Sequence, residues 1–157
     1  MKPKVYVETT IISYLTARPS RDLIIAGHQQ VTHEWWQTTR LDFALVSSQL
    51  VVREAGAGDP AAAQERLALL GELTLLEITE EALALAQHIL QTGAIPVSFP
   101  EDALHVAVAV VNGIEYLLTW NYKHLANARM RSKIEAACRG LGYEAVIICT
   151  PEELMEV

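Results

Sequence analysis

Positive charge is scarce in this chain of 157 residues: 12 lysines and arginines stand against 19 acidic residues, and the net charge is −7. A protein that coats nucleic acid regardless of sequence is basic, so the charge argues against this class. A nuclease is not excluded, because a metal site contributes acidic residues of its own and bound cations offset their charge. The basic residues are partly grouped after Trp120, as Lys123, His124, Arg129, Arg131 and Lys133.

Cysteines and long apolar runs are also few. The two cysteines, Cys138 and Cys149, form no CxxC pair, so we expect both thiols to be reduced and buried. No apolar run reaches the ~18–20 residues that a membrane helix needs. The first four residues lead into a strand-like run without a signal-peptide pattern. We therefore expect a cytoplasmic protein that does not associate with membranes.

Hydrophobic residues make up 51% of the chain, enough for the core of one domain over residues 1–157. Short β-branched and apolar runs predict strands at residues 5–7, 44–47, 73–76, 116–119 and 145–149. Propensity, caps and glycine stops predict helices at about residues 21–39 (capped by Ser20), 48–54 (capped by Ser48), 61–70, 79–91, 101–111, 123–125 and 129–139. This order is typical of an α/β fold with a parallel sheet between helices.

Four polar residues stand where a strand or an apolar run meets a helix: Glu8, Glu54, Asp102 and Asn121. In an open parallel sheet the functional crevice lies beyond the carboxyl ends of the strands. Glu8 follows the first strand, and Asn121 follows the strand at residues 116–119, so both belong on this rim. Asp102 opens the helix that leads into that strand. We expect the four side chains to share one cleft.

The residue types in this cleft indicate a site for a hard cation. Mg²⁺ and Mn²⁺ prefer carboxylate, amide carbonyl and water oxygens. Acids gathered without a cation would repel one another. A bound metal activates water and stabilises the charge of a phosphoryl transition state, so that no protein nucleophile is needed. An aspartyl-phosphate mechanism is disfavoured, because it needs an Asp where this chain has Glu8 or Asn121.

Three runs resemble the PIN-domain family, and within it the VapC-type toxins of bacterial toxin–antitoxin pairs. They are the runs at residues 5–10 (VYVETT), 102–107 (DALHVA) and 117–127 (LLTWNYKHLAN). The resemblance implies a PIN-like three-layer sandwich, Mg²⁺- or Mn²⁺-dependent endoribonuclease activity that leaves 5′-phosphate and 3′-hydroxyl ends, a homodimer and a cognate antitoxin. Carried over by position, Glu8, Glu54, Asp102 and Asn121 are the catalytic and metal-binding residues, and Thr9 is the small hydroxyl residue beside the first acid.

Two positions depart from the family pattern. The first acid is usually Asp, whereas this chain has Glu8, and the fourth position is Asn121, which adds no charge. A second hypothesis is therefore a catalytically weak PIN-fold module for binding or regulation. Under this hypothesis, restoring Asp at position 8 would produce a large gain of cleavage.

Each candidate also has a simpler interpretation. Glu8 could be a surface acid at a helix start, Asp102 an acid favoured by the helix dipole, and Asn121 a turn residue. Glu54 could form an exposed pair with Arg53. His105, one helical turn after Asp102, is interpreted as a packed histidine. Thr9, His124 and Arg129 are candidate substrate contacts. A groove for an antitoxin helix is expected between residues 11–15 and 30–52.

Overall fold

The computed structural model describes residues 1–155 and has one sheet of five parallel strands, in the order β3-β2-β1-β4-β5. The strands are β1 (Lys4–Val7), β2 (Ala44–Ser48), β3 (Thr74–Leu76), β4 (Tyr116–Leu118) and β5 (Ile147–Cys149). The predicted parallel sheet is confirmed. The last strand is shorter than predicted, because its partner β4 begins only at Tyr116, which pairs with Ile147.

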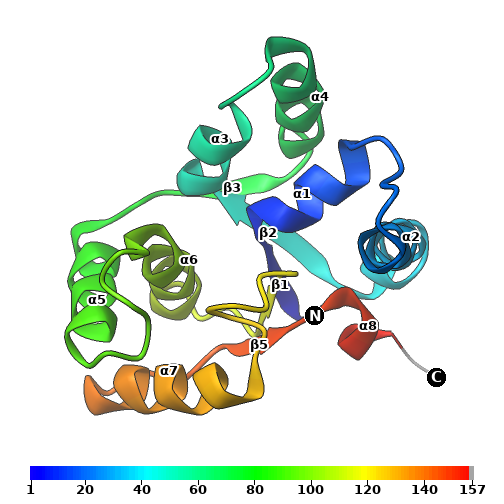
Figure 1. Ribbon diagram of the computed structural model, residues 1–157. Coiled ribbons are helices and arrows are strands. Elements are labelled where there is room, and N and C mark those ends of the chain that lie inside the picture. Colours follow the sequence, from blue (N-terminus) through cyan, green and yellow to red (C-terminus); the bar gives the residue numbers. More distant parts are fainter. Residues whose placement is uncertain (156–157) are drawn as a thin grey trace.

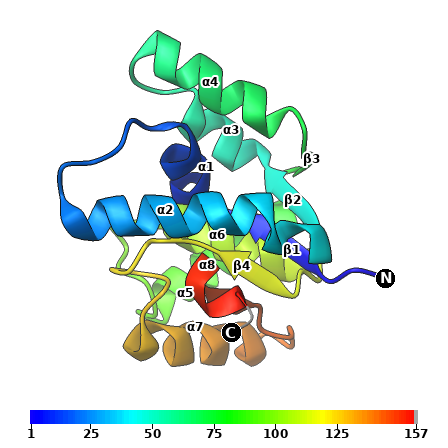
Figure 2. The ribbon, with the colours of Figure 1, turned by 90° about the vertical axis from the view of Figure 1, so that its right-hand side faces the viewer.

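Helices cover both faces of this sheet. They are α1 (Thr9–Thr16), α2 (Leu23–Gln37), the 3-10 turn η1 (Thr39–Asp42), α3 (Gln49–Ala55), α4 (Pro60–Leu70), α5 (Glu80–Gln91), α6 (Pro100–Val111), α7 (Ala128–Gly140) and α8 (Pro151–Leu154). Figure 1 shows α5, α6 and α7 on one side of the strands and α1, α2 and α8 on the other, with α3 and α4 near β2 and β3. In the view of Figure 2, α2 crosses in front of the sheet, with α8 below it. This arrangement is the predicted three-layer α/β sandwich.

Local side chains set most helix starts. Ser48 accepts a hydrogen bond from the Val51 amide and begins α3, as predicted. The start of α2 differs from the prediction, since Asp22 caps this helix by accepting bonds from two backbone amides while Ser20 accepts the Asp22 amide. The predicted helical segment at 123–125 is instead part of a turn that precedes the cap residue Asn127.

The core packs against both faces of the middle strands, with Ile11, Ile12 and Trp35 of α1 and α2 on one face and α6 on the other. Val5, Tyr6 and Val7 of β1 and Leu117 and Leu118 of β4 have no solvent exposure. Helix α6 is buried continuously from Ala103 to Val110, so it is the central helix on its face. Burying one large aliphatic side chain contributes about 1.5–3 kcal/mol. The strand ends and the first turn of α6 therefore stand on a well-packed support. Among residues 1–155, no helix has both the length and the apolar composition needed to cross a bilayer.

Candidate metal centre

The candidate site lies where β1 and β4 run side by side. The chain connects β1 to β2 on one side and reaches β4 on the other side only after β3, so the strand order reverses between β1 and β4. Such a reversal opens a crevice at the carboxyl ends of parallel strands. Glu8 is the first residue after β1, and its amide donates to the Leu118 carbonyl at 3.1 Å. The sequence therefore places Glu8 and the end of β4 on the same rim, as predicted.

Glu8 is held by hydroxyl groups rather than by solvent. Its side chain is only 4% exposed, and Oε1 accepts hydrogen bonds of 2.5 Å from both Thr10 and Thr119. The two threonine hydroxyls in turn accept the amides of Trp120 at 2.9 Å and Asn121 at 3.0 Å. Although Glu8 occupies the N-cap position of α1, its side chain makes no capping bond. The interpretation of Glu8 as a surface acid is therefore wrong.

Glu54 reaches the same crevice from the last turn of α3. Its Oε1 accepts hydrogen bonds from the Thr9 hydroxyl at 2.5 Å and from His105 Nε2 at 2.7 Å. The side chain is 30% exposed, which leaves it open to a ligand. Arg53 is exposed, and no ion pair among residues 1–155 joins it to Glu54, as expected for helix neighbours that face different directions. The alternative of an exposed Arg53–Glu54 pair is wrong.

His105 connects Glu54 to the sheet. Its ring is buried (1% exposed), and Nδ1 lies 2.7 Å from the Tyr6 hydroxyl, which lies 2.7 Å from the Ser48 hydroxyl. The prediction of a packed, hydrogen-bonded histidine is correct but incomplete. Ligand atoms of Glu8, Glu54 and His105 all lie within 4.8 Å of one another. The available signal was its spacing, since His105 follows Asp102 by one helical turn and so shares its face.

The contacts within this crevice shift the pKa values of two members, Glu54 and His105. Burial favours the neutral form of Glu54, but the hydrogen bonds from His105 and Thr9 and the charge of His105 outweigh it and lower the Glu54 pKa. Burial likewise favours neutral His105, yet its bond to Glu54 and the charges of Glu8, Glu54 and Asp102 raise the His105 pKa above its ordinary value. The crevice therefore favours positive charge.

Asp102 belongs to a second hydrogen-bonded group one turn before His105. Its Oδ1 accepts from Asn121 Nδ2 at 3.1 Å, and its Oδ2 lies 2.8 Å from His124 Nδ1. The Asn121 side-chain oxygen accepts a hydrogen bond from the His124 amide at 3.1 Å. Asn121 therefore shapes the turn and also fixes the Asp102 carboxylate in position. The ring of Phe99 lies against the His124 ring, with 4.0 Å between the centroids.

Of the remaining candidates, Thr9 contacts an acid of the site and the Arg129 side chain does not. Thr9 bonds Glu54 rather than the first acid, and the neighbouring Thr10 bonds Glu8. Arg129 lies in the first turn of α7, where its amide donates to Asn127 Oδ1, and the residue is exposed. No hydrogen bond or ion pair in the described chain joins the Arg129 side chain to the acids. The structure thus brings Glu8, Glu54 and His105 together and sets Asp102, Asn121 and His124 beside them.

The donor set fits a divalent cation. Carboxylate oxygens and an imidazole nitrogen are ordinary ligands of first-row ions, and the two acids carry the charge that such an ion neutralises. A cavity of about 520 Å³ lies beside Glu54, the one residue of the cluster that lines it. Its walls are Leu50, Arg53 and Glu54 of α3, Leu83, Ala86, Gln87 and Leu90 of α5, and Pro100, Glu101 and Leu104 of α6.

Comparison with known proteins supports the fold. No protein-family model matches the sequence, and no curated protein matches it. Among solved structures, similarity is found to a chain in the crystal structure of VapBC2 from Rickettsia felis bound to a DNA fragment from their promoter. The TM-score is 0.60 over 94% of this chain and 98% of that chain, at 13% sequence identity. At this identity the likeness bears on the fold alone, and together with the five-stranded parallel sheet it confirms the predicted three-layer α/β fold, with a parallel sheet between helices.

Proposed function

We propose that this protein is an Mg²⁺- or Mn²⁺-dependent endoribonuclease that hydrolyses RNA phosphodiester bonds and acts as the toxin of a toxin–antitoxin pair. The observation that carries the proposal is the group of two carboxylates and one imidazole at the reversal of the strand order, with Asp102 and Asn121 beside it. Metal-dependent hydrolysis needs this combination of fixed acids and an open approach.

The residues of the site have separable tasks in this proposal. Glu8 and Glu54 hold the cation, and the three threonine hydroxyls of Thr9, Thr10 and Thr119 fix the direction of their carboxylates. Asp102 completes the acidic wall, and its two hydrogen bonds leave it fixed in position. A divalent cation held there would stabilise the negative charge that develops on the phosphate during hydrolysis. Fixed acids of this kind need no rearrangement when the substrate arrives.

The RNA would approach a negatively charged protein, so local features must guide it. The cavity beside Glu54 is lined by apolar side chains and by those of Arg53 and Gln87, and its volume of about 520 Å³ accommodates a nucleobase. On the other side of the acids, His124 is part of the site and Arg129 lies exposed on α7. We assign both to phosphate contacts on the strand that enters the crevice.

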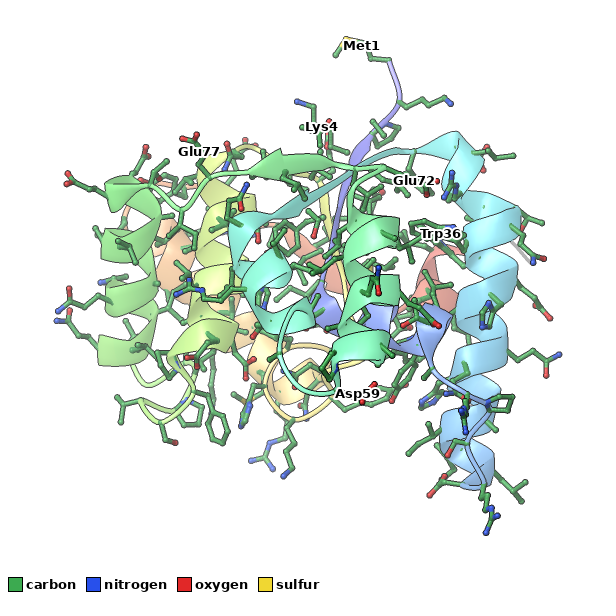
Figure 3. The ribbon with its side chains drawn as sticks, turned by 90° about the horizontal axis from the view of Figure 1, so that it is seen from above. Met1, Lys4, Trp36, Asp59, Glu72 and Glu77 are labelled. Atoms are coloured by element: carbon green, nitrogen blue, oxygen red, sulfur yellow. The ribbon has the colours of Figure 1, made fainter. Side chains whose placement is uncertain are left out.

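The toxin role has support from the fold likeness to a chain of a VapBC2 complex bound to promoter DNA. By analogy we propose a cognate antitoxin, a joint complex on promoter DNA, a toxin homodimer and a cytoplasmic location where RNA is present. A groove of about 460 Å³ between α1, α2 and α4 is suited to the antitoxin. Trp36 projects from α2 towards α4 in Figure 3, and Glu65 and Glu72 line the same groove. Its acidic rim favours a basic amphipathic helix.

Cleavage of a mixed cellular RNA pool tests the enzyme proposal. Wild-type protein should cut RNA with Mg²⁺ or Mn²⁺ and not with EDTA, and Asp102→Ala should abolish cutting. Glu80→Ala is the matched control, since Glu80 also lies in the first turn of a helix, is exposed, and its side chain makes no hydrogen bond or ion pair among residues 1–155. Absence of cutting by wild-type protein with metal bound would favour the binding module instead.

A further inference from the structure

His105 is placed as a metal ligand would be, although the sequence indicated only a packed histidine at this position. Its Nε2 lies 2.7 Å from Glu54 Oε1, and both residues belong to the three-residue cluster that includes Glu8. Two ligand atoms about 2.1 Å from one ion and at right angles lie about 3 Å apart. The pair therefore needs little movement to share an ion.

We infer that His105 binds the cation directly through Nε2, and that the resulting centre of two carboxylates and one imidazole prefers Mn²⁺ to Mg²⁺. This inference rests on the divalent-metal nuclease proposed above and names the ligand that sets its metal preference. Imidazole nitrogen suits first-row transition ions, whereas Mg²⁺ favours oxygen ligands and retains its water. A nitrogen ligand therefore separates the two ions in a site where carboxylates alone would accept either.

The environment of the ring supports this role. Metal-binding histidines nearly always use the second ring nitrogen in a hydrogen bond that fixes the ring and its tautomer. Here Nδ1 meets the buried Tyr6 hydroxyl, which is itself held by Ser48. To bind a cation, His105 would give up the Nε2 proton that it shares with Glu54 and keep the proton on Nδ1, where it hydrogen-bonds to the Tyr6 hydroxyl. The lone pair of Nε2 would then face the crevice. Tyr6 is thus a positioning residue, since it acts on the metal only through His105.

The ring also has no freedom to turn away. His105 is 1% exposed, sits in the continuously buried part of α6 and packs edge-on against the Tyr6 ring at 5.8 Å between centroids. A histidine that served only to orient Glu54 would leave the cation with oxygen ligands alone. The two roles therefore predict different atoms bound to the metal.

Pulsed electron paramagnetic resonance of Mn²⁺ added to the metal-free full chain tests the inference. We expect a coupling to a directly bound histidine nitrogen, which changes when the protein carries ¹⁵N-labelled histidine. The coupling should persist in His124→Gln and disappear in His105→Gln. His124 is the matched control, because it also contacts an acid of the site but lies outside the three-residue cluster.

Calorimetric titration supplies a second measurement. Wild-type protein should bind Mn²⁺ at least tenfold more tightly than Mg²⁺, and His105→Gln should remove this preference. Tyr6→Phe keeps the ring and loses the hydroxyl, so it should weaken Mn²⁺ binding about 10–100-fold while the nitrogen coupling remains.

The outcomes distinguish this inference from the proposed function. Bound Mn²⁺ without any histidine coupling, or coupling that disappears only in His124→Gln, would overturn the role of His105 and leave a metal nuclease with other ligands. No Mn²⁺ binding together with no metal-dependent RNA cleavage would overturn the inference by removing the proposed function. The ¹⁵N experiment uses wild-type protein and so does not depend on whether a variant folds.

Discussion

Glu8→Asp tests whether the site requires glutamate at position 8 or is an aspartate site that glutamate has weakened. The substitution keeps the charge and therefore the repulsion between acids, but it withdraws the carboxylate by one C–C bond, about 1.5 Å. The two hydrogen bonds of 2.5 Å from Thr10 and Thr119 would lengthen to about 4 Å, beyond hydrogen-bond range. The same two hydroxyls accept hydrogen bonds from the backbone amides of Trp120 and Asn121, so the change would also disturb this turn.

The loss should be large because the groups are buried. A hydrogen bond to a charged group contributes about 1.5–3 kcal/mol, and partial relaxation of the turn recovers some of it, so we expect a net destabilisation of about 2–4 kcal/mol. For a chain of this size that corresponds to a fall of about 5–15 °C in Tm. The Mn²⁺ affinity and the rate of RNA cleavage should fall as well, since the carboxylate no longer points at the site.

Chemical denaturation of the protein in the presence of EDTA measures the stability, and a separate Mn²⁺ titration measures the metal affinity. Glu8→Gln keeps the length and the acceptor oxygen, so its stability should stay within about 1 kcal/mol of wild type while Mn²⁺ binding falls. Glu101→Asp, an exposed acid, should change stability by less than about 0.5 kcal/mol. If Glu8→Asp were as stable as wild type and cleaved RNA faster, the reasoning would be refuted and the site would be a decayed aspartate site.

Three further predictions concern neighbouring groups. Thr9→Val removes a hydroxyl that holds Glu54, so Mn²⁺ affinity should fall about tenfold in calorimetry; unchanged affinity would contradict this role. The pKa of His105 is raised in the folded protein, so in EDTA the protonated ring stabilises the fold. This contribution is complete below about pH 6.5, the ordinary pKa of histidine, and is lost as the pH rises through the pKa of His105 in the folded protein. The free energy of unfolding should therefore decline with pH more steeply in wild type than in His105→Gln, and parallel curves would exclude the effect. Burial raises the pKa of Cys138 to about 11 and that of Cys149 to about 12, so alkylation at pH 8 should require unfolding; rapid labelling of folded protein would disagree.

Much of the fold was predictable because its signals are local. The strand at β1 is a β-branched and aromatic run, α3 begins after a serine that caps it, and α6 begins with Pro100. The start of α2 was less predictable, because Ser20 and Asp22 both have side chains that can cap a helix. In the structure Asp22 is the cap, and Ser20 accepts a hydrogen bond from the Asp22 amide instead. The length of β5 depended on β4, its partner more than 25 residues earlier in the chain.

The site was predictable in part for the same reason. Glu8 and Asn121 follow strands that lie side by side, so topology alone brings them to one rim. The position of His105 against Glu54 joins residues 51 positions apart, and its second bond goes to Tyr6, 99 positions away. No local pattern encodes such contacts. For that reason the sequence indicated a packed histidine but not its place among the acids.

The most direct test of the central claim is the chemistry of the RNA ends produced by wild-type protein. A 5′-labelled RNA is incubated with Mn²⁺ or with EDTA, and the fragment ends are determined. Metal-assisted hydrolysis predicts cleavage only with the metal, with 5′-phosphate and 3′-hydroxyl ends. Cleavage that persists in EDTA and leaves 2′,3′-cyclic phosphate ends would contradict the account, because it would show attack by the RNA's own 2′-hydroxyl without a metal centre.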